Sequence, residues 1–470
     1  MTQISRRDTL SILAATVAVG SSTRALAKSS TSGYKLSTFS VDVTPPMGHP
    51  LLAGLSPPVQ AVDDPLFAKG WVLTGPGKPI VVAAVDWCEI RNDAYDRWRE
   101  MLAQAANTDP EHIFLSSVHQ HDAPLADLEA ERILQRNKSA AQLIDLQFHE
   151  RTVQNVADAV QKSLASAQPV THYGVGKARV EQIASNRRYL ASDGTPRHDR
   201  VSSMAPGYAT DQPDGSIDPW LRTLSFWNGD RPLVAMSAYA THPMAFYRTG
   251  RVTADFPGMA RARRQKETPG VLQIYVSGAS GNIVAGKYND GSEESRRNLA
   301  HRLYEGMAEA WNATDRYPLE QAEFRSAPLA LQPSLVPALG RESLERQLAS
   351  EDTPQRAALG LSWLKRCESG KRLTIPVLDL GRVQYILLPA ESYVEFQLLA
   401  AKMRPDSTVI VAGYGECGPG YVPIERAWAE RDTNLNDWCW IAPGAESAMT
   451  AAIQQALSPE SLEETACYSC

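Results

Sequence analysis

Short apolar runs bounded by glycine, proline or polar clusters recur along the chain and predict β-strands. They cover residues 79–88, 112–118, 232–240, 271–278, 383–389 and 408–414. Longer stretches with helical spacing of apolar residues lie between them, at residues 94–106, 143–167, 295–311 and 444–457. The segment from Arg341 to Lys371 predicts further helices before the last strands. This interleaving predicts an α/β (mixed α+β) fold, a layered single domain with mixed sheets covered by helices.

Polar residues follow the second of these runs in the stretch SSVHQHDAP, residues 116–124. Alternate side chains of an extended chain share a face, so His119 and His121 are expected to point the same way. Two such imidazoles could hold a divalent cation, or one could bind metal while the other moves protons. Two ordinary hydrogen-bonded loop histidines are the alternative. The familiar H-x-H-x-D-H pattern is not met because Asp122 follows His121 directly, so a metal site needs ligands from elsewhere in the chain.

Three more potential ligands stand just past other apolar runs. His242 precedes a proline after residues 232–240, Glu391 follows residues 383–389, and Tyr421 lies beyond the glycine-rich turn after residues 408–414. Taken singly, each residue could have a purely structural role. His242 could form a His-Pro turn, Glu391 could be a solvated carboxylate, and Tyr421 could be packed by its ring. Side chains delivered from several strand ends converge at one edge of a sheet, where function is usually found. Nitrogen and oxygen ligands with one open position are typical of catalytic zinc, so their shared placement favours a metal site at the strand tips.

Residues 1–27 resemble a bacterial twin-arginine export signal. The stretch contains Arg6 and Arg7, a modest apolar segment from Leu10 to Gly20, and a small-residue Ala-Leu-Ala sequence that suits cleavage. The apolar segment is too short for a spanning helix. We therefore expect a protein that the twin-arginine machinery exports in folded form, to the periplasm or beyond, with residues 28–470 as its mature domain.

Composition narrows the possible partners. The chain of 470 residues has a formal net charge of −6, and loss of three arginines and one aspartate with residues 1–27 leaves −8. A mildly acidic protein has no electrostatic reason to bind nucleic acid. No later stretch is long and apolar enough to predict a transmembrane segment. The six cysteines show no paired C-x-x-C metal pattern, although Cys467 and Cys470 could oxidise in the periplasm.

Eight short motifs occur in an order that resembles the neutral/alkaline non-lysosomal ceramidase N-terminal-domain family. They are DVTPPMGHPLLAG, SSVHQHDAP, NRR at 186–188, THPMAF, ADFPG, SGASGNIV, LPAE and GYVP followed by APGAES. The resemblance covers essentially all of residues 28–470. It implies one Zn²⁺ per chain, bound by His119, His242, Glu391 and Tyr421. It further implies His121 as the proton shuttle, Arg187 near the substrate carbonyl, and hydrolysis of an amide or, less readily, an ester.

Three departures limit what the resemblance implies about the substrate. Val284 occupies the position of a serine in the ceramidase G-[DN]-x-S-P segment. A tyrosine that follows the ligand tyrosine in ceramidases falls here near Thr433. The sequence also ends soon after residues 444–457, so we expect no immunoglobulin-like C-terminal domain. Zinc chemistry is thus expected to be retained, whereas specificity for ceramide is not.

Two other functions remain open from the sequence. A descendant of the fold that binds a solute without turnover is suggested by Val284 and Thr433. An enzyme acting on a carbohydrate or cell-envelope derivative is suggested by export, and its pocket would be lined by aromatic residues and carboxylates. Trp87, Asp93, Glu416 and Trp438 are candidates for that lining, with core tryptophans and solvated acids as the alternative. The substrate is accordingly a small molecule, a lipid or a glycan.

Overall fold

The computed structural model describes residues 33–349 and 354–458, and all of them belong to one compact unit, Thr31–Cys470. The expected α/β fold with mixed sheets and covering helices is confirmed. No helix in the described part of the chain combines the length and the hydropathy that a bilayer span requires. Residues 1–27, Cys467 and Cys470 lie outside the described residues.

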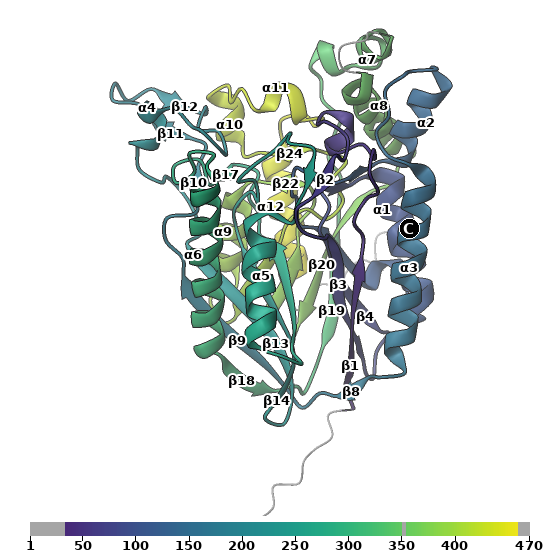
Figure 1. The fold of residues 1–470 in the computed structure, drawn as a ribbon, viewed down its shortest axis with the longest axis vertical. Helices are drawn as coiled ribbons and strands as arrows, with labels where there is room; N and C mark the ends of the chain where they lie inside the picture. Colours follow the sequence, from purple (N-terminus) through teal and green to yellow (C-terminus); the bar gives the residue numbers. More distant parts are fainter. Residues whose placement is uncertain (1–32, 350–353, 459–470) are drawn as a thin grey trace, which may run out of the picture. The chain divides into compact units, whose positions relative to one another are not determined.

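Three mixed sheets form the framework (Figure 1). In hydrogen-bonding order, the first sheet contains β6 (Ile113–Ser117), β4 (Ile80–Val85), β3 (Phe67–Thr74), β1 (Lys35–Asp42) and β8 (Gln168–Pro169). The second contains β16 (Leu272–Ser277), β14 (Arg231–Tyr239), β13 (Trp220–Asn228), β9 (His172–Arg179) and β18 (Asp315–Pro318). The third contains β19 (Glu323–Leu329), β20 (Leu373–Asp379), β21 (Val383–Leu387) and β23 (Thr408–Ala412).

One edge of each sheet is a parallel pair, whereas the other pairings are antiparallel. The parallel pairs are β4 with β6, β14 with β16, and β21 with β23. These six strands are the six that the apolar runs predict. Strands of a parallel pair end side by side, so each sheet delivers two chain segments to one place.

The carboxyl ends of these parallel edges are joined by hydrogen bonds between sheets. The Ser277 hydroxyl donates to the Val118 carbonyl at 2.8 Å, which links β16 to the chain leaving β6. The Gly413 amide donates to the Ser277 carbonyl at 2.8 Å, and the Ser117 amide donates to the Tyr414 carbonyl at 3.0 Å. A Cβ on Gly413 would lie 2.8 Å from the Gly278 carbonyl oxygen, so this close approach requires glycine. We call this meeting point the three-sheet junction.

Amphipathic helices cover the sheets. Helices α1 (Asn92–Ala106) and α3 (Leu146–Leu164) pack on the first sheet, and α5 (Asp255–Glu267) and α6 (Glu293–Asn312) pack on the second. Helices α9 (Val394–Met403) and α12 (Ala445–Leu457) pack on the third. The predicted helices between Arg341 and Lys371 are α7 (Arg341–Leu348) and α8 (Pro354–Glu368). Helix α8 packs against both α7 and α2 (Leu128–Arg136).

Short elements connect this framework. The short helices are α4 (Gly207–Thr210), α10 (Glu425–Ala429) and α11 (Leu435–Trp438), with 3₁₀ turns at Leu52–Gly54, Pro110–His112 and Pro337–Leu339. The two-residue strands outside the three sheets are β2 (Ala61–Val62), β5 (Glu89–Ile90), β7 (Leu125–Ala126), β10 (Ser185–Asn186), β11 (Tyr189–Leu190), β12 (Pro196–Arg197), β15 (Arg251–Val252), β17 (Ile283–Val284), β22 (Glu391–Ser392) and β24 (Tyr421–Val422).

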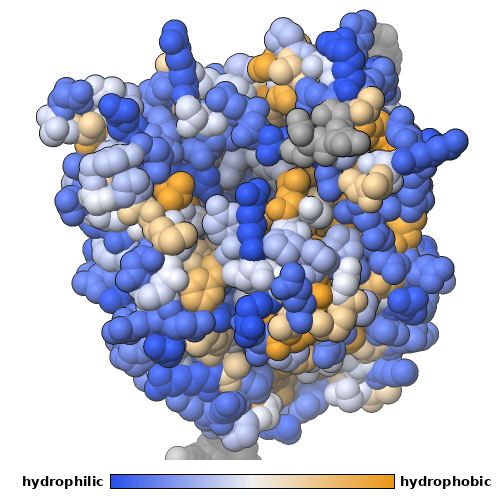
Figure 2. Space-filling view, turned by 45° about the horizontal axis from the view of Figure 1, so that its top comes forward, coloured by the Kyte–Doolittle hydropathy of each residue, from blue (hydrophilic) through white to orange (hydrophobic). Residues whose placement is uncertain are grey.

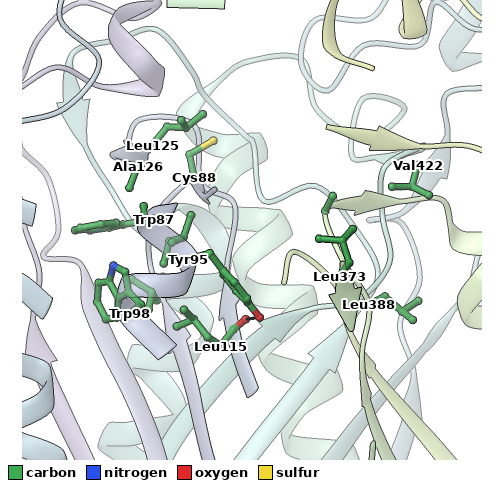
Figure 3. Packing of buried hydrophobic residues seen from close by; sticks show 14 of the residues in the cluster. Trp87, Cys88, Tyr95, Trp98, Leu115, Leu125, Ala126, Leu373, Leu388 and Val422 are labelled. Atoms are coloured by element: carbon green, nitrogen blue, oxygen red, sulfur yellow. Dashed lines mark hydrogen bonds between the residues drawn. The ribbon is translucent and has the colours of Figure 1, made fainter. Parts of the chain in front are cut away.

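A buried aromatic group supports the end of β4. Trp87 and Trp98 meet edge to face with ring centroids 5.5 Å apart, and both are fully buried (Figure 3). The His149 ring on α3 lies 6.1 Å from the Trp87 ring and 6.4 Å from the Trp98 ring. Both His149 ring nitrogens are buried without a hydrogen-bond partner. Burial therefore lowers the pKa of His149 from 6.5 to about 4.

Protonation of His149 is expected to destabilise the fold at acid pH. A folded-state pKa below the unfolded value means that the neutral ring stabilises the fold above pH 6.5 and that this contribution is lost as the pH falls towards 4. The full loss is roughly 3 kcal/mol. Denaturant unfolding of the wild type and His149→Phe at pH 7.5 and pH 4.5 should show a smaller acid loss in the variant. The exposed His301→Gln variant is the control, and equal acid losses in wild type and His149→Phe would contradict the prediction.

Candidate metal centre

The turn after β6 places the His119 side chain at the three-sheet junction. Its backbone has a φ of 77°, in the left-handed region that non-glycine residues rarely adopt. The His119 amide donates to the Trp87 carbonyl at 2.9 Å. Its ring stacks on the Tyr414 ring with centroids 4.2 Å apart, and its Nδ1 donates to the Cys88 carbonyl at 2.9 Å. These contacts fix the direction of the imidazole, and backbone strain of this kind is concentrated at functional sites.

His242 is held in the same manner from the second sheet. It follows the end of β14 and is fully buried. Its Nδ1 lies 2.7 Å from the Ser280 carbonyl oxygen and 3.0 Å from that of Ile283. Because a carbonyl oxygen can only accept, Nδ1 carries the hydrogen and Nε2 keeps its lone pair. The same reasoning leaves Nε2 of His119 with a lone pair, since its Nδ1 faces the Cys88 carbonyl.

Glu391 follows β21 of the third sheet and lies close to both rings. The preceding residue, Ala390, has a φ of 50°, and Glu391 then pairs with Tyr421 across the parallel strands β22 and β24. Glu391 Oε2 lies 3.0 Å from His242 Nε2 and 3.3 Å from His119 Nε2. One ligand atom of each of these three buried residues lies within 4.8 Å of the other two. The structure therefore brings together three of the four expected ligands.

The donor chemistry of this group fits a metal ion. Glu391 has a pKa held well below its ordinary range: burial opposes ionisation, but His119 and His242 outweigh it. Burial would lower the pKa of His119, yet the Glu391 carboxylate raises it. Without a cation, a proton must therefore lie between the Nε2 atoms of the two histidines and the Glu391 carboxylate, which are all acceptors. A divalent ion would replace that proton and satisfy two imidazole nitrogens and one carboxylate oxygen, as a zinc site requires.

Tyr421, the fourth expected ligand, lies beside this group and interacts with Arg187. Its side chain lines the same cavity as His119 and Glu391. The Arg187 guanidinium lies 5.4 Å from the Tyr421 ring centroid. Burial raises the pKa of Tyr421, and Arg187 opposes the rise.

His121 lies on the open side of the group. Its Nε2 is 3.3 Å from His119 Nε2, and the two rings meet edge to face with centroids 4.9 Å apart. Cys88, His119 and His121 also place one ligand atom each within 4.8 Å of the others. His121 is partly exposed, unlike His119. It is close enough to act either as a ligand or as the base that the sequence suggests.

Arg187 reaches the group from the chain after β10. Its Nη2 lies 3.3 Å from His242 Nε2, and its Nη1 donates to Asn434 Oδ1 at 2.9 Å. Asn434 stands next to the exposed Thr433, at the place where the family resemblance sets a tyrosine. The sequence reasoning missed Asn434, whose only signal is its place in the polar stretch RDTNLND.

A cavity of about 170 Å³ opens onto His119, His121, Glu391 and Tyr421. Its other lining residues are Leu52, Leu55, Cys88, Glu89, Tyr247, Arg248, Arg356 and Trp438. Of the suggested aromatic and acidic lining, Trp438 is present. Trp87 and Glu416 are instead buried, and Asp93 lines a separate cleft. Glu89 directly follows the first apolar run, residues 79–88. The sequence reasoning did not identify it as a lining residue.

Val284 does not line this cavity. Its side chain is fully buried, and β17 pairs it with Ser185, whose hydroxyl donates to the Val284 carbonyl at 2.9 Å. The position that the family resemblance sets against a ceramidase serine is therefore occupied here by a packed apolar side chain.

Gly281 sets the position of Glu391 through a close backbone contact. A Cβ at residue 281 would lie 2.1 Å from the Glu391 carbonyl oxygen, and the Gly281 amide donates to the Ser392 carbonyl at 3.0 Å. Gly281→Ala should thus displace β22 and weaken metal binding by roughly ten- to a hundredfold, the scale for a lost supporting contact around a metal. Zinc affinity measured against a competing chelator checks this. Gly77→Ala, which meets no atom within 4 Å, is the control, and equal affinities would refute the prediction.

Comparison with known proteins identifies the fold. No protein-family model matches the sequence, and no curated protein matches it significantly. Solved structures do match, among them two ceramidases. One is described as a ceramidase complexed with C2, with a TM-score of 0.67 and 16% identity over 90% of this chain and 74% of that one. The other is neutral ceramidase from Pseudomonas aeruginosa, with a TM-score of 0.65 and 15% identity over the same shares. The chain therefore has the fold of the neutral ceramidases.

Proposed function

We propose that the protein is a zinc-dependent hydrolase that cleaves the amide bond of an N-acylated substrate. The observation that carries this proposal is the convergence of His119, His242 and Glu391, whose lone pairs face one another in a buried group. A cavity of about 170 Å³ gives a substrate access to that group. The ceramidase fold supports the same reaction class, since the chain is similar in structure to enzymes of that name.

His119, His242 and Glu391 would hold the metal, with Tyr421 proposed as the fourth ligand. When bound, zinc would lower the pKa of a water ligand to roughly 7 and polarise the carbonyl under attack. His121 is the proposed base, which would accept a proton from the attacking water at Nε2 and return one to the leaving amine. Burial lowers the pKa of His121 well below its ordinary value, so the ring is neutral at pH 7.

Arg187 supplies the positive charge for the oxygen that becomes negative during attack. Its guanidinium is buried against His242 and is held by Asn434 and the Tyr421 ring. A donor that is fixed before the reaction stabilises developing charge without reorganisation. Two further elements of the proposal, export through the twin-arginine pathway and a periplasmic or secreted location, rest on residues 1–27, which lie outside the described residues.

The first test of this proposal is metal content. Protein purified without chelator should carry about one zinc per chain, as a single tetrahedral site requires. His119→Ala and His242→Ala should each lose most of it because each removes one of three convergent ligands. Metal analysis by mass spectrometry measures the loss, with His301→Ala as the control at an exposed histidine. Full zinc retention by the double variant His119→Ala/His242→Ala would eliminate the site.

A second test separates the proposed base from the ligands. His121→Ala should keep its zinc but lose roughly a hundredfold or more in kcat for N-acyl substrates, the scale for a missing general acid or base. Measuring kcat and bound zinc on the same preparation makes the distinction. Loss of zinc equal to that of His119→Ala would instead identify His121 as a ligand.

A further inference from the structure

The rim of the cavity carries two arginines whose charge is not balanced there. Arg248 and Arg356 line it beside Tyr247 and Trp438. Among residues 33–349 and 354–458, no carboxylate lies within 4.0 Å of the Arg248 guanidinium, whose described contact is the Tyr247 ring at 5.7 Å. Arg356 contacts Asp437 at 3.2 Å, but the Asp437 side chain is 69% exposed. An exposed pair of this kind holds its partners weakly.

The acids deeper in the cavity are already neutralised. Glu89 Oε2 accepts from Arg91 at 3.0 Å, and both side chains are fully buried. Glu391 faces His119 and His242. Neither carboxylate is therefore available to the rim arginines, so the described residues give the entrance to the cavity a net positive charge.

The segment that carries Arg248 is fixed at the rim by hydrogen bonds from the next residue. Its φ of 60° is in the left-handed region, which non-glycine residues rarely adopt. The next residue, Thr249, donates to Asp122 through its amide at 3.0 Å and through its hydroxyl at 2.8 Å. Asp122 directly follows His121, and the Tyr247 ring lies edge-on to the His121 ring at 6.1 Å. The segment that presents Arg248 is thus anchored to the proposed base.

Arg356 also has unused hydrogen-bonding capacity. Its Nε is buried and has no hydrogen-bond partner among the described residues, although the side chain as a whole is 30% exposed. A guanidinium suits carboxylate and phosphate groups, which it can contact through two parallel hydrogen bonds. The face of the molecule seen in Figure 2 is predominantly hydrophilic, with hydrophobic residues scattered over it.

From these observations we propose that the substrate is an N-acylated amine that carries an anionic group, recognised at the cavity rim by Arg248 and Arg356. This rests on the proposed function, since it takes the cavity as the active site. Both a carboxylate, as in an N-acyl amino acid, and a phosphate supply the required chemistry. A neutral amide such as a ceramide leaves both guanidinium groups without an acceptor.

Matched substrates test the proposal in the zinc-loaded full-length protein. N-hexanoylglycine carries a carboxylate, N-hexanoyl-O-phosphoethanolamine carries a phosphate, and N-hexanoylglycinamide is neutral. We expect a higher kcat/KM for one or both anions than for the amide. Arg248→Gln should lower kcat/KM for the preferred anion roughly ten- to a hundredfold, the scale of a charge-assisted hydrogen bond, and should lower it less for the neutral substrate. Arg248→Gln/Arg356→Gln should abolish the preference.

The matched control is Arg231→Gln. Arg231 is an exposed arginine at the start of β14, the strand whose far end leads to His242. This variant should keep the preference for anionic substrates. The carboxylate and phosphate arms identify which anion is recognised. Equal kcat/KM for charged and neutral substrates in the wild type, or an unchanged preference in the double variant, would overturn the proposal.

A binding measurement separates this proposal from the proposed reaction. N-(hexylsulfonyl)glycine and N-(hexylsulfonyl)glycinamide replace the scissile amide by a sulfonamide, and calorimetry compares their Kd. Tighter binding of the acid, lost in Arg248→Gln, supports the anion site even if no amide is hydrolysed. Hydrolysis without any effect of charge on binding supports the hydrolase and overturns the anion site.

Discussion

The hydrogen bonds that join three parallel sheet edges determine where every residue of the candidate site lies. At the three-sheet junction, Ser277 of β16 contacts the chain leaving β6 through its hydroxyl and the chain leaving β23 through its carbonyl. Buried backbone groups must find partners, and here the ends of one sheet are satisfied by the ends of the others. The segments that follow cannot shift independently. His119, His242 and Glu391 each leave from a different sheet and still meet within hydrogen-bonding distance.

The electrostatics of the site follow from that arrangement. Backbone carbonyls occupy the Nδ1 side of His119 and His242, so both rings direct a lone pair towards the Glu391 carboxylate. Three acceptors in a dry interior are unfavourable together unless a cation or a proton lies between them. The opposite shifts in the pKa of His119 and Glu391 express this demand for positive charge. The fold thus holds these three acceptors close together, and a bound metal ion would remove the unfavourable interaction between them.

Much of this arrangement could be predicted from local sequence, because parallel edge strands are buried and read as continuous apolar runs. The ends of those runs located His119, His242 and Glu391. The antiparallel strands β1, β3, β9 and β13 escaped prediction, since lysine, glycine, serine and threonine interrupt their apolar pattern. Asn434, Glu89 and Arg248 were missed for a different reason. Their importance depends on neighbours distant in sequence, such as Arg187 for Asn434, and no local pattern encodes such a contact.

The long sequence separation between the converging residues has a consequence for how the protein matures. His242 and Glu391 are 149 residues apart. His119 follows β6, a strand of the first sheet. Closing loops of that length costs chain entropy before stabilising contacts form. Sites built from residues distant in sequence therefore form late in folding. An unfolded or half-folded chain offers a metal only scattered single ligands. A metal ion that binds this group would therefore be captured in the last stage of folding, after all three sheets have formed, and the compartment in which folding is completed would have to supply it.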